Sequence, residues 1–192
     1  CERFRGKKLA SLFYENSTRT RESFEQAAAN LGMQVVGFSG TEGTSVKKGE
    51  TIADTIRMYA GYGADMFVMR HNLDGAPQAA ADVLKVPVIN GGDGCNGHPT
   101  QTLLDLMTIK EAHGTIDGLK IAMVGDLRYG RTVHSLLQVA EQYEFEPWLV
   151  APENVAMPQW RVDDFRKATG RDVVFTNDLM EVIKKVDVLY MT

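Results

Sequence analysis

Short apolar runs alternate along the chain with longer segments in which apolar residues recur every three or four positions. The apolar runs occupy residues 9–14, 34–39, 65–70, 86–90, 119–126, 145–152 and 172–176, and a last one closes the sequence. Helical spacing is found at residues 18–32, 50–63, 76–84, 98–114, 130–143, 158–170 and 178–186. Because continuous apolar runs separated by helices are typical of parallel strands, the pattern predicts an α/β fold made of two parallel-sheet units.

The best candidate for a boundary between the two units is the turn at residues 113–118, which carries Gly114 and Gly118. We therefore expect one domain at residues 1–114 and a second at residues 115–192. Because the chain opens almost directly into one predicted strand and closes on another, we also expect it to be truncated at both ends.

Composition excludes several classes of function. The chain has 192 residues and a net charge of -4, which argues against general binding to nucleic acid. No apolar run approaches the roughly 20 residues that cross a bilayer, so we expect no membrane partner. Cys1 and Cys95 form no CxxC pair, which favours a reducing, cytoplasmic setting and no structural zinc.

Polar residues gather where the predicted strands end, and ligands of open α/β sheets bind at the carboxyl ends of strands. Ser17, Thr18, Arg19 and Thr20 stand between the first strand and the first helix. Free N–H groups at a helix N-terminus, hydroxyls and a guanidinium together favour a phosphate ligand. The alternative is an ordinary helix cap by Ser17 or Thr18, with Arg19 on the surface.

Cationic residues follow the second and third strands. The loop "SGTEGTSVKKGET" carries Lys47 and Lys48, which either reach an anionic site, in this chain or a neighbour, or belong to a solvated loop. Arg70 and His71 end the third strand, and the alternative for them is a surface pair.

Two predicted helices begin with residues that could bind a small molecule. His98 and Gln101 lie one turn apart, and a histidine at a helix start tends to be neutral and able to donate to a carbonyl, although it could merely cap the helix. Arg131 and Thr132 follow "VGDLRYG", which lacks the GxGxxG of dinucleotide sites, so Arg131 either binds a carboxylate or lies on the surface. So many donors at strand ends of an acidic chain predict a site for a small, multiply anionic substrate.

The same residues carry a family resemblance. The stretches "FYENSTRTR", "SVKKGET", "MRH", "HPTQTLLDL" and "GDLRYGRTVHS" occur in this order and near these spacings in the carbamoyltransferases. The resemblance covers nearly the whole chain, and "KKGE" and "GDLRYGRTVHS" are similar to the aspartate branch of the family. It implies a carbamoyl-phosphate domain followed by part of an amino-acid domain, with the family's first helix and the C-terminal amino-acid contacts missing.

The resemblance also implies roles for the matching positions. Ser17, Thr18, Arg19 and Thr20 would hold the phosphate of carbamoyl phosphate, and Thr20, Arg70 and His98 would polarise its carbonyl. Gln101 would hold the carbamoyl amide, and Lys48 would reach the site from a neighbouring subunit of a homotrimer. Arg131 and Thr132 would bind L-aspartate through its carboxylate.

The implied reaction transfers a carbamoyl group to the amino group of L-aspartate, in de novo pyrimidine biosynthesis, without a cofactor or a metal. Regulatory chains are possible further partners. Two alternatives stay open: an ornithine carbamoyltransferase, against which Arg131 argues, and a non-catalytic anion-binding scaffold. Glu15 stands two residues before the anion loop, and we expect it to pair with Arg131 and help to bring the two units together.

Overall fold

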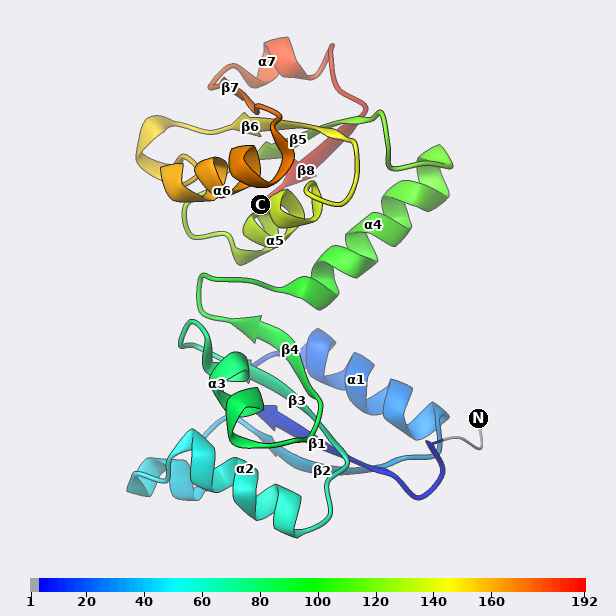
Figure 1. Cartoon of the computed structure of the whole chain (residues 1–192), viewed down its shortest axis with the longest axis vertical. Helices are drawn as coiled ribbons and strands as arrows, with labels where there is room; N and C mark the ends of the chain where they lie inside the picture. Colours follow the sequence, from blue (N-terminus) through cyan, green and yellow to red (C-terminus); the bar gives the residue numbers. More distant parts are fainter. Residues whose placement is uncertain (1–3) are drawn as a thin grey trace. The chain divides into compact units, whose positions relative to one another are not determined.

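The computed structural model describes residues 4–192 and consists of two compact units, the first ending at Gly94 and the second covering Cys95–Thr192. Each unit contains one parallel sheet of four strands covered by helices (Figure 1). The α/β fold with two parallel-sheet units is thus confirmed. Cys1, one of the two cysteines used above, lies outside the described residues.

The sheet of the first unit contains β1 (Lys8–Phe13), β2 (Gln34–Ser39), β3 (Met66–His71) and β4 (Val88–Asp93), in the order β2-β1-β3-β4. Every neighbouring pair is parallel. The first two strands lie within one residue of their predicted ranges, whereas β4 begins two residues later than predicted because Val86 and Pro87 precede the ladder.

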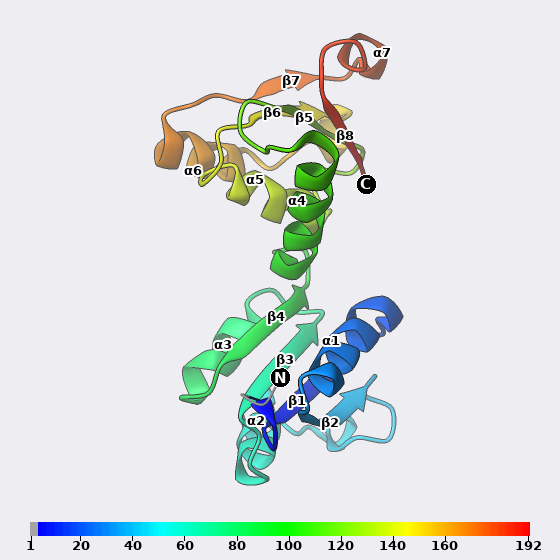
Figure 2. The same cartoon turned by 90° about the vertical axis from the view of Figure 1, so that its right-hand side faces the viewer.

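Helices cover both faces of this sheet (Figure 2): α1 (Thr18–Asn30) lies on one face, and α2 (Ile52–Gly61) and α3 (Ala76–Val83) lie on the other. Successive side chains of a strand point to opposite faces, which divides the core in two. Phe13 packs with Phe24 and Ala28 of α1, while Leu12 packs with Ile56 of α2 and Ala80 of α3. Within the predicted loop at 39–51, Ser45–Lys48 form a short 3-10 helix, η2.

The second unit repeats this design with β5 (Lys120–Val124), β6 (Glu146–Val150), β7 (Val174–Thr176) and β8 (Val188–Met191), in the order β7-β6-β5-β8. Its helices are α4 (Pro99–His113), α5 (Arg131–Val139), α6 (Gln159–Thr169) and the short α7 (Leu179–Val182), with a 3-10 turn η3 (Glu153–Val155). Met123 packs with Leu136 of α5 and Phe165 of α6 in one cluster, and Val124 packs with Val182 of α7 in another.

Helix α4 belongs to the second compact unit. Leu106 and Ile109 on this helix join the core that contains Leu136 and Phe165. The compact units therefore divide between Gly94 and Cys95, before α4, whereas the sequence placed a domain boundary after it, at residue 114. The boundary at residue 114 stays a prediction.

The strand order fixes where ligands can be expected in each unit. In the first sheet β1 lies between β2 and β3, so the chain leaves β1 in one direction and β3 in the other. Crevices form at such switch points, beyond the carboxyl ends of the strands. In the first unit this point lies beyond Phe13 and His71, and in the second it lies beyond Val124 and Met191, where β5 and β8 are neighbours.

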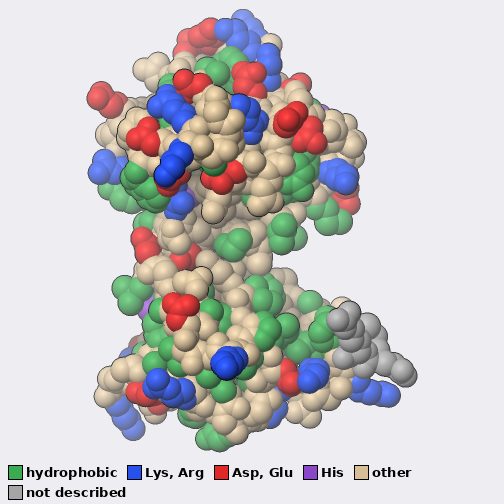
Figure 3. All heavy atoms as spheres, viewed as in Figure 1, with side chains coloured by type: hydrophobic (Ala, Val, Ile, Leu, Met, Phe, Trp, Pro, Cys, Tyr) green, Lys and Arg blue, Asp and Glu red, His purple; other side chains and the backbone are tan. Residues whose placement is uncertain are grey.

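On the face of the second unit that Figure 3 shows, acidic and basic side chains are interspersed. None of the helices within residues 4–192 is long and apolar enough to cross a membrane.

Candidate functional site

The first predicted segment lies at the switch point of the first sheet. Ser17 occupies the N-cap position of α1 in an extended conformation, with φ -154° and ψ 101°, but its side chain makes no capping hydrogen bond. The helix then begins at Thr18, and Arg19 is exposed. Ser17 thus occupies the N-cap position and Arg19 lies on the surface, as the alternative of an ordinary helix start expected, but no side-chain hydrogen bond caps the helix. N–H groups at the start of α1 remain for another acceptor, as a phosphate site requires.

Arg70 lies beside this segment because β1 and β3 are neighbours. The Tyr14 N–H donates to the Arg70 carbonyl at 2.9 Å, which ties the start of the loop to β3. The Arg70 guanidinium donates to the Glu15 carboxylate over 2.6 Å from Nε to Oε1. It also approaches the Thr20 hydroxyl, with 3.4 Å between Nη1 and Oγ1. The structure thus brings Arg70 and Thr20 together at the head of α1.

Glu15 forms an ion pair with Arg70, a residue of its own unit. The side chains of Arg70 and Glu15 are only 13% and 28% exposed, so the pair is partly shielded from water. A carboxylate in this position both fixes the guanidinium and competes with any anion for it. The predicted pairing of Glu15 with Arg131 joins residues of different units and stays a prediction.

His71 closes the same edge of the sheet as a buried residue. Its Nδ1 atom accepts the Leu73 N–H at 3.0 Å, and its ring lies against Tyr14 with 4.5 Å between centroids. Burial lowers the pKa of His71, and the negative charge of Glu15 opposes that shift. The alternative of an Arg70–His71 surface pair is therefore wrong, because His71 is 8% exposed and the Arg70 side chain is 13% exposed.

Lys48 belongs to a different element from the residues described above, the 3-10 helix η2. It is exposed at the end of η2, and neighbouring Lys47 forms an ion pair with Glu42. Within residues 4–192, Lys48 makes no ion pair. Its position on an exposed segment is compatible with a site in another copy of the chain, and that assignment stays a prediction.

In the second unit, His98 and Gln101 lie at the start of α4. His98 is the N-cap residue, is 6% exposed, and accepts the Gln101 N–H at Nδ1 over 3.4 Å. Because Nδ1 accepts, a neutral ring carries its proton on Nε2. The prediction that this histidine caps a helix is confirmed.

The backbone before α4 is held by two residues of α5 that were not predicted from the sequence. The His98 N–H donates to the Ser135 hydroxyl at 2.8 Å. The His134 ring bridges two carbonyl oxygens, with 2.8 Å from Nδ1 to Cys95 and 2.9 Å from Nε2 to Leu127. His134 and Ser135 lie near the start of α5, which begins with Arg131 and Thr132, so the same part of this helix orders both predicted groups of the second unit.

Gln101 has a partner that the sequence analysis also missed. Its Nε2 atom donates to Asp105 Oδ1 at 3.0 Å, and the Tyr190 hydroxyl donates to Asp105 Oδ2 at 3.0 Å. Burial raises the pKa of Tyr190 to about 12, and Asp105 adds to that rise while Thr132 opposes it. The four-residue spacing of Gln101 and Asp105 could have predicted their contact, because side chains four positions apart on a helix are neighbours. The hydrogen bond from Tyr190 on β8 to Asp105 could not be predicted from local sequence, because the two residues are 85 positions apart.

Arg131 and Thr132 form the first turn of α5, at the switch point of the second sheet. Gly130 is the N-cap residue and provides no side-chain cap. The preceding turn is fixed by Asp126, whose Oδ1 accepts the N–H groups of Arg128 and Tyr129, both at 3.0 Å. An arginine at the uncapped start of a helix provides the groups that a carboxylate needs.

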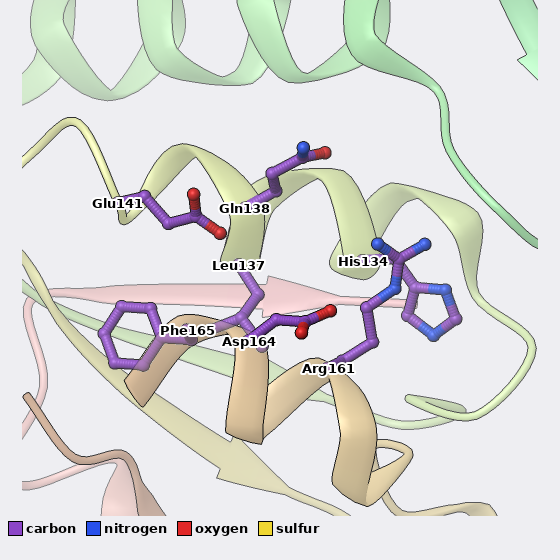
Figure 4. A pocket seen from close by; sticks show the side chains of 7 residues that line it. All are labelled: His134, Leu137, Gln138, Glu141, Arg161, Asp164 and Phe165. Carbon is purple, nitrogen blue, oxygen red and sulfur yellow. The ribbon is translucent and has the colours of Figure 1, made fainter. Parts of the chain in front are cut away.

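Two pockets within the second unit do not coincide with the predicted residues. One, of about 60 Å³, lies between α5 and α6 and is lined by side chains that include His134, Glu141 and Arg161 (Figure 4). A volume of that size holds only a few waters. The other, of about 350 Å³, is mainly apolar, and its one charged lining residue is Glu153. Neither suits an anionic substrate.

The described residues offer no alternative centre built on a metal. Within residues 4–192, no group of three or more His, Cys, Asp or Glu side chains is placed to hold a metal ion.

The predicted residues form two sets, each at a switch point of its own sheet. Ser17, Thr18, Arg19, Thr20 and Arg70 surround the head of α1, and His98, Gln101, Arg131 and Thr132 begin α4 and α5.

Family comparisons agree with this arrangement. Residues 1–111 match the family described as "Aspartate/ornithine carbamoyltransferase, carbamoyl-P binding domain". Residues 117–192 match "Aspartate/ornithine carbamoyltransferase, Asp/Orn binding domain".

Individual relatives point the same way. The chain is 55% identical over 188 residues to the aspartate carbamoyltransferase catalytic subunit of Thermococcus kodakarensis, and 54% identical to that of Thermococcus onnurineus. Each alignment covers 98% of this chain but 60% of the relative, so the chain spans about three fifths of their length.

Solved structures of aspartate transcarbamoylase from Trypanosoma cruzi have the same fold. The complex with carbamoyl phosphate and aspartate has a TM-score of 0.90 and 42% identity, covering 97% of this chain and 63% of that one. The complex with N-(phosphonacetyl)-L-aspartic acid gives the same TM-score and identity over 97% of this chain and 60% of that one. The chain therefore belongs to the aspartate/ornithine carbamoyltransferase family.

Proposed function

We propose that the protein transfers the carbamoyl group of carbamoyl phosphate to L-aspartate, giving N-carbamoyl-L-aspartate and phosphate. The observation that carries the proposal is the grouping of Arg70 and Thr20 at the uncapped start of α1. The names of the relatives, and the carbamoyl phosphate and aspartate bound in the similar Trypanosoma cruzi structure, support this choice of substrates. The product belongs to de novo pyrimidine biosynthesis.

In this proposal the first unit binds the phosphate end of carbamoyl phosphate. The N–H groups at the start of α1 and the side chains of Ser17, Thr18, Arg19 and Thr20 donate hydrogen bonds to the phosphate oxygens. Arg70 lies against Thr20 and donates to the carbonyl oxygen, where negative charge grows during attack. Lys48 of a neighbouring subunit completes the site in a homotrimer.

The second unit supplies the groups for the carbamoyl and amino-acid parts. His98, with its proton on Nε2, donates to the same carbonyl oxygen as Arg70. Gln101 holds the carbamoyl amide, while Arg131 and Thr132 bind a carboxylate of L-aspartate at the head of α5.

The chemistry needs no side-chain nucleophile. The amine of aspartate forms a bond to the carbamoyl carbon, the bond from that carbon to the phosphate oxygen breaks, and the departing phosphate can accept a proton from the amine. Stabilisation of the oxyanion and of the leaving phosphate, together with alignment of the two substrates, accounts for catalysis by residues of these types.

The test is a comparison of acceptors. Formation of N-carbamoyl-L-aspartate from carbamoyl phosphate, with L-ornithine as the competing acceptor, separates the aspartate reaction from the ornithine alternative. Preference for aspartate that Arg131→Ala abolishes would support the proposal. Binding of phosphate without turnover by the full-length protein would favour the scaffold instead.

The homotrimer and the compartment are parts of the same proposal. A trimeric mass in sedimentation is expected, and a monomer at working concentration would leave Lys48 without the role given to it. We place the protein in the cytoplasm because its two cysteines form no CxxC pair and no disulfide framework in the sequence. Regulatory chains are possible partners and would appear as a larger assembly in the same measurement.

A further inference from the structure

Asp105 is a half-buried carboxylate beside the predicted site that has no role in the chemistry above. Its two carboxylate oxygens accept from different elements, Oδ1 from Gln101 on α4 and Oδ2 from Tyr190 on β8, each at 3.0 Å. Tyr190 is separated from Asp105 by 85 residues in the chain, so the contact depends on the packing of α4 against the second sheet.

Two similar pairs within residues 4–192 are not anchored by another element, although Asp163 also forms an ion pair with Arg166 on its own helix. Gln78 donates to Asp82 at 2.9 Å on α3, and Gln159 donates to Asp163 at 2.8 Å on α6, with the same four-residue spacing. Both of those pairs are exposed, as expected of ordinary pairs on a helix surface. The pair at Gln101 is partly buried and is anchored by a tyrosine hydroxyl from another element.

The contact determines which end of the Gln101 amide is free. A carboxylate accepts hydrogen bonds and donates none, so it binds the NH₂ end of a glutamine side chain. The Oε1 atom of Gln101 is then the end left to meet a ligand. A carbamoyl group presents an NH₂ donor, which needs an acceptor at that place. In the reverse orientation, two donors would oppose each other.

We propose that Asp105, held by Tyr190, is a positioning residue that makes Gln101 an acceptor and so selects a carbamoyl group over an acyl group of the same shape. The inference rests on the proposed function, because it takes the carbamoyl amide as the ligand of Gln101. Acetyl phosphate is the matched probe, since it has a methyl group where carbamoyl phosphate has NH₂. A site built to bind the NH₂ rejects the analogue that lacks it.

The experiment measures the affinity of the protein for carbamoyl phosphate and for acetyl phosphate by calorimetry. Asp105→Leu, which is similar in size and cannot accept, should reduce the preference for carbamoyl phosphate about fivefold. Tyr190→Phe should reduce it by less, because Asp105 keeps its bond to Gln101. Asp82→Leu is the matched control and should leave the preference unchanged. In a Gln101→Ala background, Asp105→Leu should have no further effect.

An unchanged preference in Asp105→Leu, an equal loss of affinity for both ligands, or the same effect without Gln101 would overturn the inference. The side-chain NH₂ resonances of Gln101 provide a test without ligand. In the unaltered protein one of these protons should exchange slowly with solvent, and Asp105→Leu should remove that protection. If the unaltered protein binds neither phosphate compound, the proposed function fails, and the Gln101 resonances still decide whether Asp105 orients the amide.

Discussion

Replacement of Glu15 by glutamine should affect stability and anion binding in opposite directions. The Arg70–Glu15 contact is 2.6 Å long, and the side chains are 13% and 28% exposed. Glutamine keeps a hydrogen-bond acceptor but removes the charge, and charge-assisted bonds are about twice as strong as neutral ones. Because a neutral bond contributes about 1 kcal/mol, Glu15→Gln should lower the free energy of unfolding by about 1 kcal/mol.

The same change should strengthen binding of inorganic phosphate, since the carboxylate that competes for Arg70 is gone. The gain should be about two- to fivefold at low ionic strength and should shrink as salt is added. Urea unfolding followed by far-UV circular dichroism measures the first effect, and calorimetry measures the second. Both tryptophans, Trp148 and Trp160, lie in the second unit, so their fluorescence alone would not report on unfolding of the first.

Glu42→Gln is the matched control, because Glu42 is 84% exposed in its pair with Lys47. Exposed pairs of this kind contribute little, so neither stability nor phosphate affinity should change measurably. The reasoning would be refuted if Glu15→Gln left the free energy of unfolding unchanged, or if it weakened phosphate binding.

Two further predictions concern stability. Gly37→Ala should destabilise the first unit by about 3 kcal/mol in urea unfolding, because the added Cβ would lie 1.9 Å from the Ser11 carbonyl oxygen. Gly43→Ala, where nothing lies within 4 Å, should cost only about 1 kcal/mol, which its left-handed backbone imposes, and equal effects would contradict this account. Burial lowers the pKa of His71 below its ordinary 6.5, so the unfolded chain binds the extra proton more readily. Stability should therefore fall as the pH drops below 6.5, and His71→Gln should weaken that dependence while a change at exposed His113 should not.

The sequence predicts those features that depend on local pattern. The alternation of apolar runs and helical spacing identifies the strands and helices, and the rule that ligands bind at strand ends selects Arg19, Arg70 and His98 without knowledge of the fold. The pairing of Arg70 with Glu15 is different, because it requires β1 and β3 to be neighbours, and strand order is not encoded in the spacing of residues.

The same limit applies to the compact units and to Asp105. The glycines at 114 and 118 mark a turn, but which core a helix joins depends on where residues such as Leu106 and Ile109 pack. Their packing assigns α4 to the second unit, and the local sequence pattern does not predict which core these residues join. Tyr190 reaches Asp105 across 85 residues for the same reason.

The most direct test of the central claim is calorimetric titration of the chain with carbamoyl phosphate, beside Arg19→Ala. Arg19 is exposed at the uncapped start of α1, so its removal should leave the fold intact, as circular dichroism can check. We predict that the unaltered chain binds carbamoyl phosphate and that the variant loses at least about tenfold in affinity, because one charge-assisted contact to phosphate is removed. Equal affinity in the two folded proteins would contradict the account.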